Sequence, residues 1–148
     1  MQSAASISAP LSIGQASREL GVAADTLRYY ERIGLVPRTA RSGGGQRRYA
    51  PGDLARLRFI RRAQAMDFTL AEIGALLELR AASGDVRADV RALARMKLAD
   101  IDARLSELEA LRAELGALID RCAASNSGPC PILTRLGGEI RTEDQDHA

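Results

Sequence analysis

The chain has 148 residues, which is enough for one or two small domains. Only five residues are aromatic, none is Trp, and the aliphatic residues are mostly Leu and Ala, a composition that favours an all-helical fold. The apolar runs are too short for a membrane-spanning helix, and the N-terminus lacks the basic and apolar segments of a secretion signal. These features predict a cytoplasmic protein with no membrane partner.

Charge is distributed unevenly along the chain. Residues 1–80 carry 12 Arg and 7 acidic residues, a net +5, whereas residues 81–148 carry 9 basic and 12 acidic residues, a net −3. A basic N-terminal half suggests binding to nucleic acid, and the acidic C-terminal end is expected to be solvated. On charge alone, a basic face that merely aids solubility is a fair alternative.

The first structured segment after a disordered extension at residues 1–10 is a pair of short helices. Ser12 and Gln15 have capping-box spacing and predict a helix from Ile13 to Gly21. A second helix is expected at residues 24–33, ending at a glycine. Two short helices joined by a glycine-containing turn are typical of a helix-turn-helix motif.

A small hairpin and two more helices are predicted next. Gly43 to Gly45 mark a loop tip in residues 38–49, and the flanks of this tip can pair. Pro51 is placed to begin a helix. Its apolar face comprises Leu54, Leu57, Ile60 and Ala63. Thr69 and Glu72 form a second capping box, which predicts a helix to about Leu79.

The longest predicted helix covers residues 86–121. Its apolar residues recur in steps of three and four, with one interruption at Arg112; they are Ala94, Leu98, Ile101, Leu105, Leu108, Leu115 and Ile119. So long a stripe cannot be buried within one small subunit, and no second helix of matching length exists. The pattern therefore predicts a coiled coil with a second copy, with Leu98, Ile101, Leu105, Leu108 and Leu115 in the dimer seam.

Cys122 and Cys130, the chain's two cysteines, enclose seven small, polar or turn-forming residues after this helix. In a reducing compartment such a pair indicates a metal or redox site rather than a structural disulfide, with incidental thiols as the alternative. Two thiolates suit a d10 monovalent ion in linear coordination, whereas Zn(II) normally takes four ligands. His147 lies in the acidic tail and is expected to be a surface residue.

No catalytic constellation is visible in the sequence. There is a single histidine, and Gly43 to Gly45 are not followed by the Lys-Ser/Thr of a phosphate-binding loop. An enzyme is therefore not expected.

Several motifs together resemble the MerR family of transcriptional regulators over roughly residues 11–136. They are LSIGQA (11–16), TLRYYE (26–31), GLVP (34–37), RRY (47–49) and LRFI (57–60). Within the family, the Cys-x7-Cys-Pro-Ile-Leu loop is similar to that of the copper efflux regulators, which sense Cu(I), Ag(I) and Au(I). The resemblance implies an all-α fold with a small β wing.

The resemblance also implies a domain order. A winged helix-turn-helix DNA-binding domain with connector helices would occupy residues 11–80, an antiparallel dimerisation helix 86–121, and a metal-binding loop 122–136, followed by a flexible tail at 137–148. The implied homodimer binds an over-long promoter spacer with and without metal. Metal then makes it bend and untwist the DNA so that RNA polymerase can start.

The candidate DNA contacts are cationic and hydroxyl side chains, which are the groups that phosphate oxygens need. They are Thr26, Arg28, Tyr30, Arg41, Arg47 and Arg48. By resemblance, Arg28 and Tyr30 lie on the recognition helix and Arg41 and Arg47 on the wing. Thr26 and Asp25 are placed to reach base edges. Tyr49 is a further candidate for DNA contact, but packing in the core is favoured for both Tyr29 and Tyr49.

Two positions depart from the family pattern. Gln46 stands in the wing where relatives usually have Tyr. Arg87 stands where divalent-metal members carry a third cysteine and monovalent-metal members usually carry Ser. A monovalent ion with two thiolates has a net charge of −1, and Arg87 and Arg91, near the positive end of the long helix, are candidates to offset it.

Three alternatives stay open at this point. One is a sensor of a divalent metal such as Hg(II), Pb(II), Zn(II) or Cd(II), against which the missing third cysteine argues. Another is a sensor of thiol oxidation. The third is a coiled-coil adaptor that does not bind DNA, against which the basic wing argues.

Overall fold

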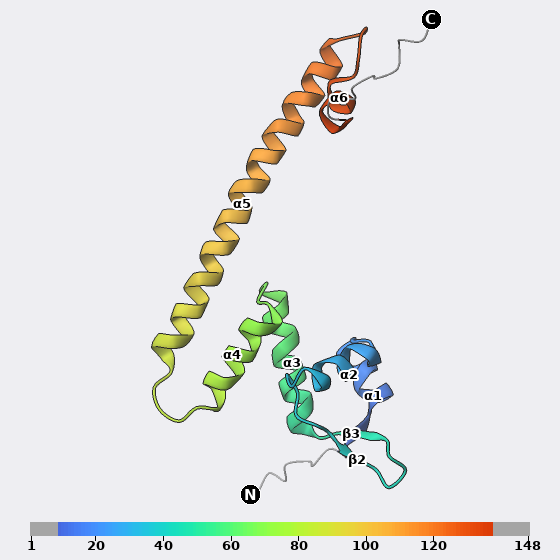
Figure 1. Ribbon diagram of the computed structural model, residues 1–148, viewed down its shortest axis with the longest axis vertical. Helices are drawn as coiled ribbons and strands as arrows, with labels where there is room; N and C mark the ends of the chain where they lie inside the picture. Colours follow the sequence, from blue (N-terminus) through green and yellow to red (C-terminus); the bar gives the residue numbers. More distant parts are fainter. Residues whose placement is uncertain (1–8, 138–148) are drawn as a thin grey trace, which may run out of the picture. The chain divides into compact units, whose positions relative to one another are not determined.

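The computed structural model describes residues 9–137, and the predictions for His147 and for most of the two terminal segments lie outside this range. The described chain is mostly helical with one small sheet, as expected (Figure 1). Its elements are β1 (Leu11–Ser12), α1 (Ile13–Leu20), α2 (Ala24–Arg32), β2 (Ala40–Arg41), β3 (Arg47–Tyr49), α3 (Pro51–Ala65), α4 (Leu70–Ala81), α5 (Arg87–Ala124) and α6 (Pro131–Gly137).

The helix-turn-helix forms where its capping signals predict it. The backbone N–H of Gln15 donates to Ser12 Oγ at 3.3 Å, and the Gln15 side chain accepts from the Ser12 N–H at 2.9 Å. This reciprocal cap starts α1, which ends at Gly21 with φ at 62°. Glycine adopts this left-handed conformation without the steric penalty of a side chain, so α2 can begin three residues later. Both helix predictions are confirmed within one residue at each end.

The predicted hairpin is also confirmed. The three strands form an antiparallel sheet in the order β1–β3–β2, with Leu11 opposite Tyr49 and Arg41 opposite Arg47. In the loop between β2 and β3, the Ser42 N–H donates to the Gln46 carbonyl at 2.7 Å. This hairpin is the wing, and its pairing with β1 joins it to the start of α1.

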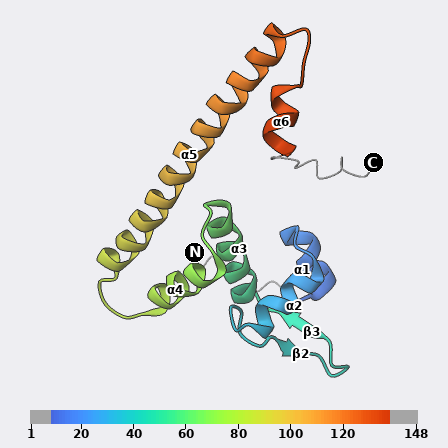
Figure 2. The same cartoon turned by 45° about the horizontal axis from the view of Figure 1, so that its top comes forward.

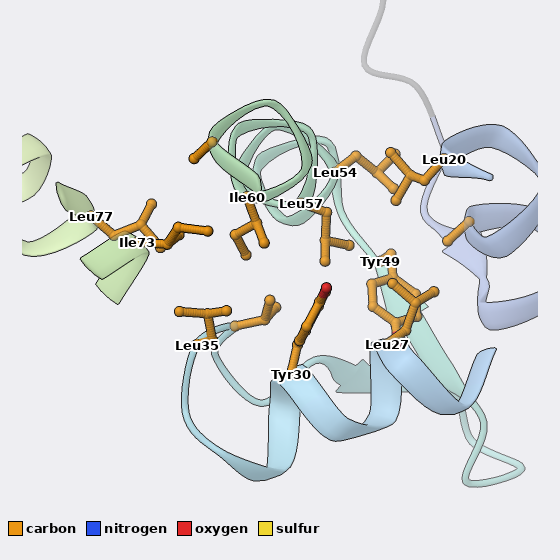
Figure 3. Close-up of a cluster of buried hydrophobic side chains, with 13 residues drawn as sticks. Leu20, Leu27, Tyr30, Leu35, Tyr49, Leu54, Leu57, Ile60, Ile73 and Leu77 are labelled. Atoms are coloured by element: carbon orange, nitrogen blue, oxygen red, sulfur yellow. The ribbon is translucent and has the colours of Figure 1, made fainter. Parts of the chain in front are cut away.

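Helices α3 and α4 follow the wing and complete the first hydrophobic core. Pro51 begins α3, and all four residues of its predicted apolar face are buried. Thr69 caps α4, since the Glu72 N–H donates to Thr69 Oγ1 at 3.2 Å and the Thr69 N–H donates to Glu72 Oε2 at 2.8 Å. The core draws on α1, α2, the wing, α3 and α4 (Figure 3).

Two tyrosines enter this core from opposite elements. Tyr30 of α2 is 5% exposed, and its hydroxyl donates to Gln64 Oε1 at 3.0 Å. Tyr49 of β3 is 1% exposed, and its buried hydroxyl has no hydrogen-bond partner among the described residues. Burial, and secondarily the charge of Glu31, raise the pKa of Tyr49.

These two hydroxyls predict opposite effects of the same substitution. A buried polar group without a partner costs about 1–3 kcal/mol, whereas a satisfied hydrogen bond contributes about 1 kcal/mol. We therefore expect Tyr49→Phe to raise the free energy of unfolding by about 1 kcal/mol and Tyr30→Phe to lower it by a similar amount. Urea titration of the two variants checks this. Equal destabilisation by both would contradict the structure around Tyr49.

The described chain divides into two compact units, with the boundary inside α5 between Lys97 and Leu98. In the first unit, Lys97 is 5% exposed, and its Nζ lies 2.9 Å from Glu72 Oε2 and 5.8 Å from the centre of the Phe68 ring. The backbone N–H of Thr69, and then Lys97, lower the pKa of Glu72. The start of α5 is thus joined to the first turn of α4.

The second unit consists of the rest of α5 and of α6. The predicted seam leucines are exposed in the single chain, from 48% for Leu115 to 61% for Leu108, and Ile101 is half-buried. Helix α6 was not predicted, and it runs back beside the end of α5 (Figure 2). None of the helices within residues 9–137 is both long and apolar enough to cross a bilayer.

Candidate metal site and DNA-binding surface

The cysteine loop, residues 122–130, joins α5 to α6 and brings its two thiols together. Cys122 lies in the last turn of α5, and Cys130 directly precedes α6. Their sulfur atoms are 3.8 Å apart, and both residues are half-buried. The loop reverses the chain between the helices, with Gly128 at φ 94°. The two predicted ligands therefore face each other at one end of the second unit.

The two thiols differ in their protonation because of α6. The backbone N–H groups of Leu133 and then Ile132 point at the Cys130 sulfur and lower the pKa of Cys130. The hydrogen bond with Cys130 raises the pKa of Cys122. Cys130 is thus the thiol with the lower pKa, and either sulfur can donate the hydrogen bond between them. A soft cation would displace the thiol protons, since thiolates are the metal-binding form.

Polar contacts form at the start of helix α6 and between α6 and α5. The Thr134 N–H and hydroxyl each donate to the Cys130 carbonyl at 3.0 Å. The Arg135 Nε lies 2.5 Å from Glu114 Oε1 on α5. Leu118, on the same stretch of α5, is 6% exposed. The Thr134 bonds therefore close the first turn of α6, and the Arg135–Glu114 ion pair joins α6 to α5.

The donor set of this site is restricted to the two thiols. Within residues 9–137, no group of three or more His, Cys, Asp and Glu side chains could hold a metal ion. This donor set fits a soft ion of low coordination number and does not fit the four-ligand sites of structural zinc. Arg87 and Arg91 are exposed in the single chain, in the first turns of α5.

The candidate DNA-binding residues lie on α2 and the wing. Arg28 is exposed and forms an ion pair with Asp25 at 2.6 Å, and Thr26 is half-buried. On the wing, the Arg41 Nη1 donates to the Gly45 carbonyl at 3.1 Å, and Arg48 is half-buried. Gln46, the departure from the family pattern, is exposed beside the hairpin tip.

An arginine hollow lies between these elements. It is lined by Arg28, Glu31, Arg32, Arg38, Arg41 and Arg47. Arg47 does not extend freely into solvent, because its Nε lies 2.8 Å from Glu31 Oε2. The sequence motifs contained Glu31, but we did not predict a role for it or for Arg32 and Arg38. The signal for Glu31 in the sequence is that it is an acidic residue within a strongly basic segment.

Two tyrosine predictions are wrong. Tyr30 was expected to contact DNA, but its ring points from α2 toward α3 in the core and its hydroxyl is held by Gln64 (Figure 3). Tyr29 was expected to pack in the core but is 40% exposed, with Arg32 stacked 5.4 Å from its ring centre. The two residues lie on different faces of α2, and only Tyr30 shares a face with buried Leu27. The core position of Tyr49 is confirmed.

Comparison with known proteins connects this architecture to one family. The model for the MerR HTH family regulatory protein matches residues 11–79, and the model for MerR, DNA binding matches residues 54–118. The HTH-type transcriptional regulator HmrR of Rhizobium leguminosarum bv. viciae is 40% identical over 126 residues, covering 85% of this chain and 97% of HmrR. The regulator CueR of Salmonella typhimurium is 34% identical over 128 residues, covering 86% and 93% of the two chains.

A solved structure agrees with these relatives. The crystal structure of the transcription regulator PbrR691 from Ralstonia metallidurans CH34, in complex with lead(II), is 40% identical. The structural alignment covers 85% of this chain and 98% of PbrR691, with a TM-score of 0.71. The family models, the relatives and the solved structure therefore identify the same family. The chain belongs to the MerR family of DNA-binding transcriptional regulators, and it is not an enzyme.

Proposed function

We propose that this regulator responds to a monovalent soft metal ion, Cu(I), Ag(I) or Au(I), bound by Cys122 and Cys130. The observation that carries the proposal is the pair of thiols 3.8 Å apart, with no third donor grouped with them among residues 9–137. Soft thiolates select soft ions, and two ligands satisfy a d10 monovalent ion but leave most divalent ions short of donors. The resemblance of the Cys-x7-Cys-Pro-Ile-Leu loop to that of the copper efflux regulators supports the same assignment.

The rest of the chain would convert this signal into transcription. Two copies would pair through the exposed stripe of α5 and place two α2 helices on a pseudo-palindromic promoter. The proposed DNA contacts are Thr26, Arg28, Arg41, Arg47 and Arg48, and Tyr30 is withdrawn from this set because it is buried. Metal binding would change the bend and twist that the dimer imposes on the promoter, so that RNA polymerase can start.

The charge of the loaded site has a proposed counterpart in α5. A monovalent ion with two thiolates keeps a net charge of −1, which is unfavourable in a poorly hydrated site. Arg87 and Arg91 lie at the N-terminal end of α5, where the helix dipole adds partial positive charge. We propose that these guanidiniums of the partner subunit offset the charge, and that Arg87 keeps the site two-coordinate because it cannot ligate a metal.

A divalent ion is the second candidate signal. PbrR691, at 40% identity, has been crystallised with lead(II), so one relative with this fold binds a divalent ion. Hg(II) also accepts two thiolates, so binding alone does not separate the candidates. Oxidation of the two thiols is a further alternative, because they already lie close to contact.

The experiment that separates these signals is transcription from the regulated promoter with fully reduced protein. We expect activation by Cu(I), Ag(I) and Au(I) and none by Zn(II) or Pb(II) at the same free concentrations. A peroxide arm without metal tests the oxidation alternative. Activation by Pb(II) or Zn(II) at concentrations where Cu(I) has no effect would overturn the proposal. Activation by peroxide alone would show that the signal is thiol oxidation rather than metal binding.

A further inference from the structure

The Glu31 carboxylate is almost withdrawn from water on a face that is otherwise basic. Its side chain is only 7% exposed, although it belongs to the last turn of the recognition helix α2. One oxygen, Oε2, accepts from Arg47 Nε at 2.8 Å and from Thr39 Oγ1 at 3.4 Å. A buried charge needs such partners, since an unpaired carboxylate in this position would strongly destabilise the fold.

Glu31 is also the single acid lining the arginine hollow, where five arginines converge from α2, the following segment and the wing. Without a negative charge among them, these guanidiniums would repel one another and separate. The carboxylate therefore acts as the counter-ion around which this cluster gathers. Because Arg47 is held through its Nε, the two terminal nitrogens of its guanidinium keep their N–H donors for another acceptor.

The Glu31–Arg47 pair joins the two elements that read DNA in the proposed function, since Glu31 belongs to α2 and Arg47 to β3. We infer that Glu31 is a positioning residue for sequence discrimination: it fixes the wing relative to the recognition helix, and its charge weakens binding to phosphate backbones that the wing does not fit. Phosphate contacts set register and orientation, so a misplaced wing loses the base contacts that depend on register. A like charge near the backbone penalises every poorly fitted duplex.

The inference rests on the DNA-binding part of the proposed function and is tested without metal. The specific probe is a duplex selected from a random-sequence library by the wild-type protein, and the non-specific probe is the same duplex with its sequence scrambled. Glu31→Gln removes the charge but keeps the shape. We expect its affinity for the scrambled duplex to rise several-fold while its affinity for the selected duplex does not rise, so that the ratio of affinities falls at least several-fold.

Two further variants separate charge from position. Glu31→Asp keeps the charge but is one methylene shorter, so it should lose affinity for the selected duplex without gaining affinity for the scrambled one. Glu19→Gln is the matched control, because it removes the same charge from an ion pair with Arg58 that lies outside the arginine hollow. We expect it to leave the ratio unchanged. Thermal melts of each variant show whether it is folded, and Glu31→Asp keeps the test valid if Glu31→Gln does not fold.

The outcomes also distinguish this inference from the proposed function. If the wild-type protein does not prefer its selected duplex over the scrambled one, the proposed DNA reading itself fails. If the wild type discriminates and Glu31→Gln discriminates equally well, only the role of Glu31 is overturned. If Glu31→Gln and Glu19→Gln change the two affinities by the same factors, Glu31 acts only through its contribution to the net charge, and its positioning role is overturned.

Discussion

A Cys130→Ser variant is expected to lose the metal response while its affinity for promoter DNA stays unchanged. Serine keeps the size of the side chain but replaces a soft thiolate with a hard hydroxyl, which is a poor ligand for a soft monovalent ion. Changes outside the ligand shell already cost about 10–100-fold in metal affinity, so loss of one of two ligands should exceed about a hundredfold. Cys122→Ser should behave alike, because each thiol supplies half of the donor set.

Two measurements check this prediction: transcription as a function of metal concentration, and promoter binding in the absence of metal. The cysteine loop and the DNA-binding residues belong to different units of the chain, so the two losses should be separable. Ala123→Ser is a matched control, since it adds a hydroxyl beside Cys122 and keeps both thiols. If either cysteine variant still responds fully to Cu(I), the ligands have been wrongly assigned.

A Leu105→Asp variant is expected to dissociate into monomers or to unfold. Leu105 is 52% exposed in the single chain and lies in the middle of the stripe that would face a second copy. Fully burying a leucine contributes about 1.5–3 kcal/mol, and pairing would bury the exposed half of Leu105, or about 0.8–1.5 kcal/mol at each of two positions. The combined loss of about 1.5–3 kcal/mol corresponds to a roughly ten- to hundredfold weaker dimer, before the cost of burying two carboxylates is added.

Sedimentation at a series of protein concentrations measures this effect. Ala103→Asp serves as the control, because residue 103 lies on the opposite side of the helix and receives the same charge at a similar cost in helix propensity. This control should remain dimeric. A stable Leu105→Asp dimer with the wild-type dissociation constant would show that the seam lies on another face of α5.

Local signals were sufficient to predict most of the secondary structure. The caps at Ser12 and Thr69, the glycine at position 21 and the proline at position 51 act within one helical turn, so their effects are visible in a single stretch of sequence. The proximity of Cys122 and Cys130 was predictable for the same reason, since only seven residues separate them. Their roles, and those of the DNA-facing arginines, stay predictions.

Features that depend on distant contacts were not predictable in the same way. Seven-residue α6 is too short to show a periodic pattern, and its ion pair to Glu114 spans 21 residues. The pairing of Glu31 with Arg47 spans 16 residues and depends on how the wing folds back toward α2. Tyr30 is a different case, because its spacing of three from Leu27 places it on the buried face of α2, whereas the motif resemblance alone places it at the DNA.

Lys97 is the single lysine in a chain with twenty arginines, and the structure buries it at the junction of α4 and α5. The chain therefore has one ε-amine that can react, and this amine is inaccessible to reagents while the contact between α4 and α5 is closed. Acylation of Lys97, or cleavage by a lysine-specific protease, can proceed only through molecules in which this contact has opened. When opening and closing are fast, the reaction rate reports the free energy of that local opening. The chain thus contains a one-site reporter of whether metal or DNA loosens the junction, without any added label.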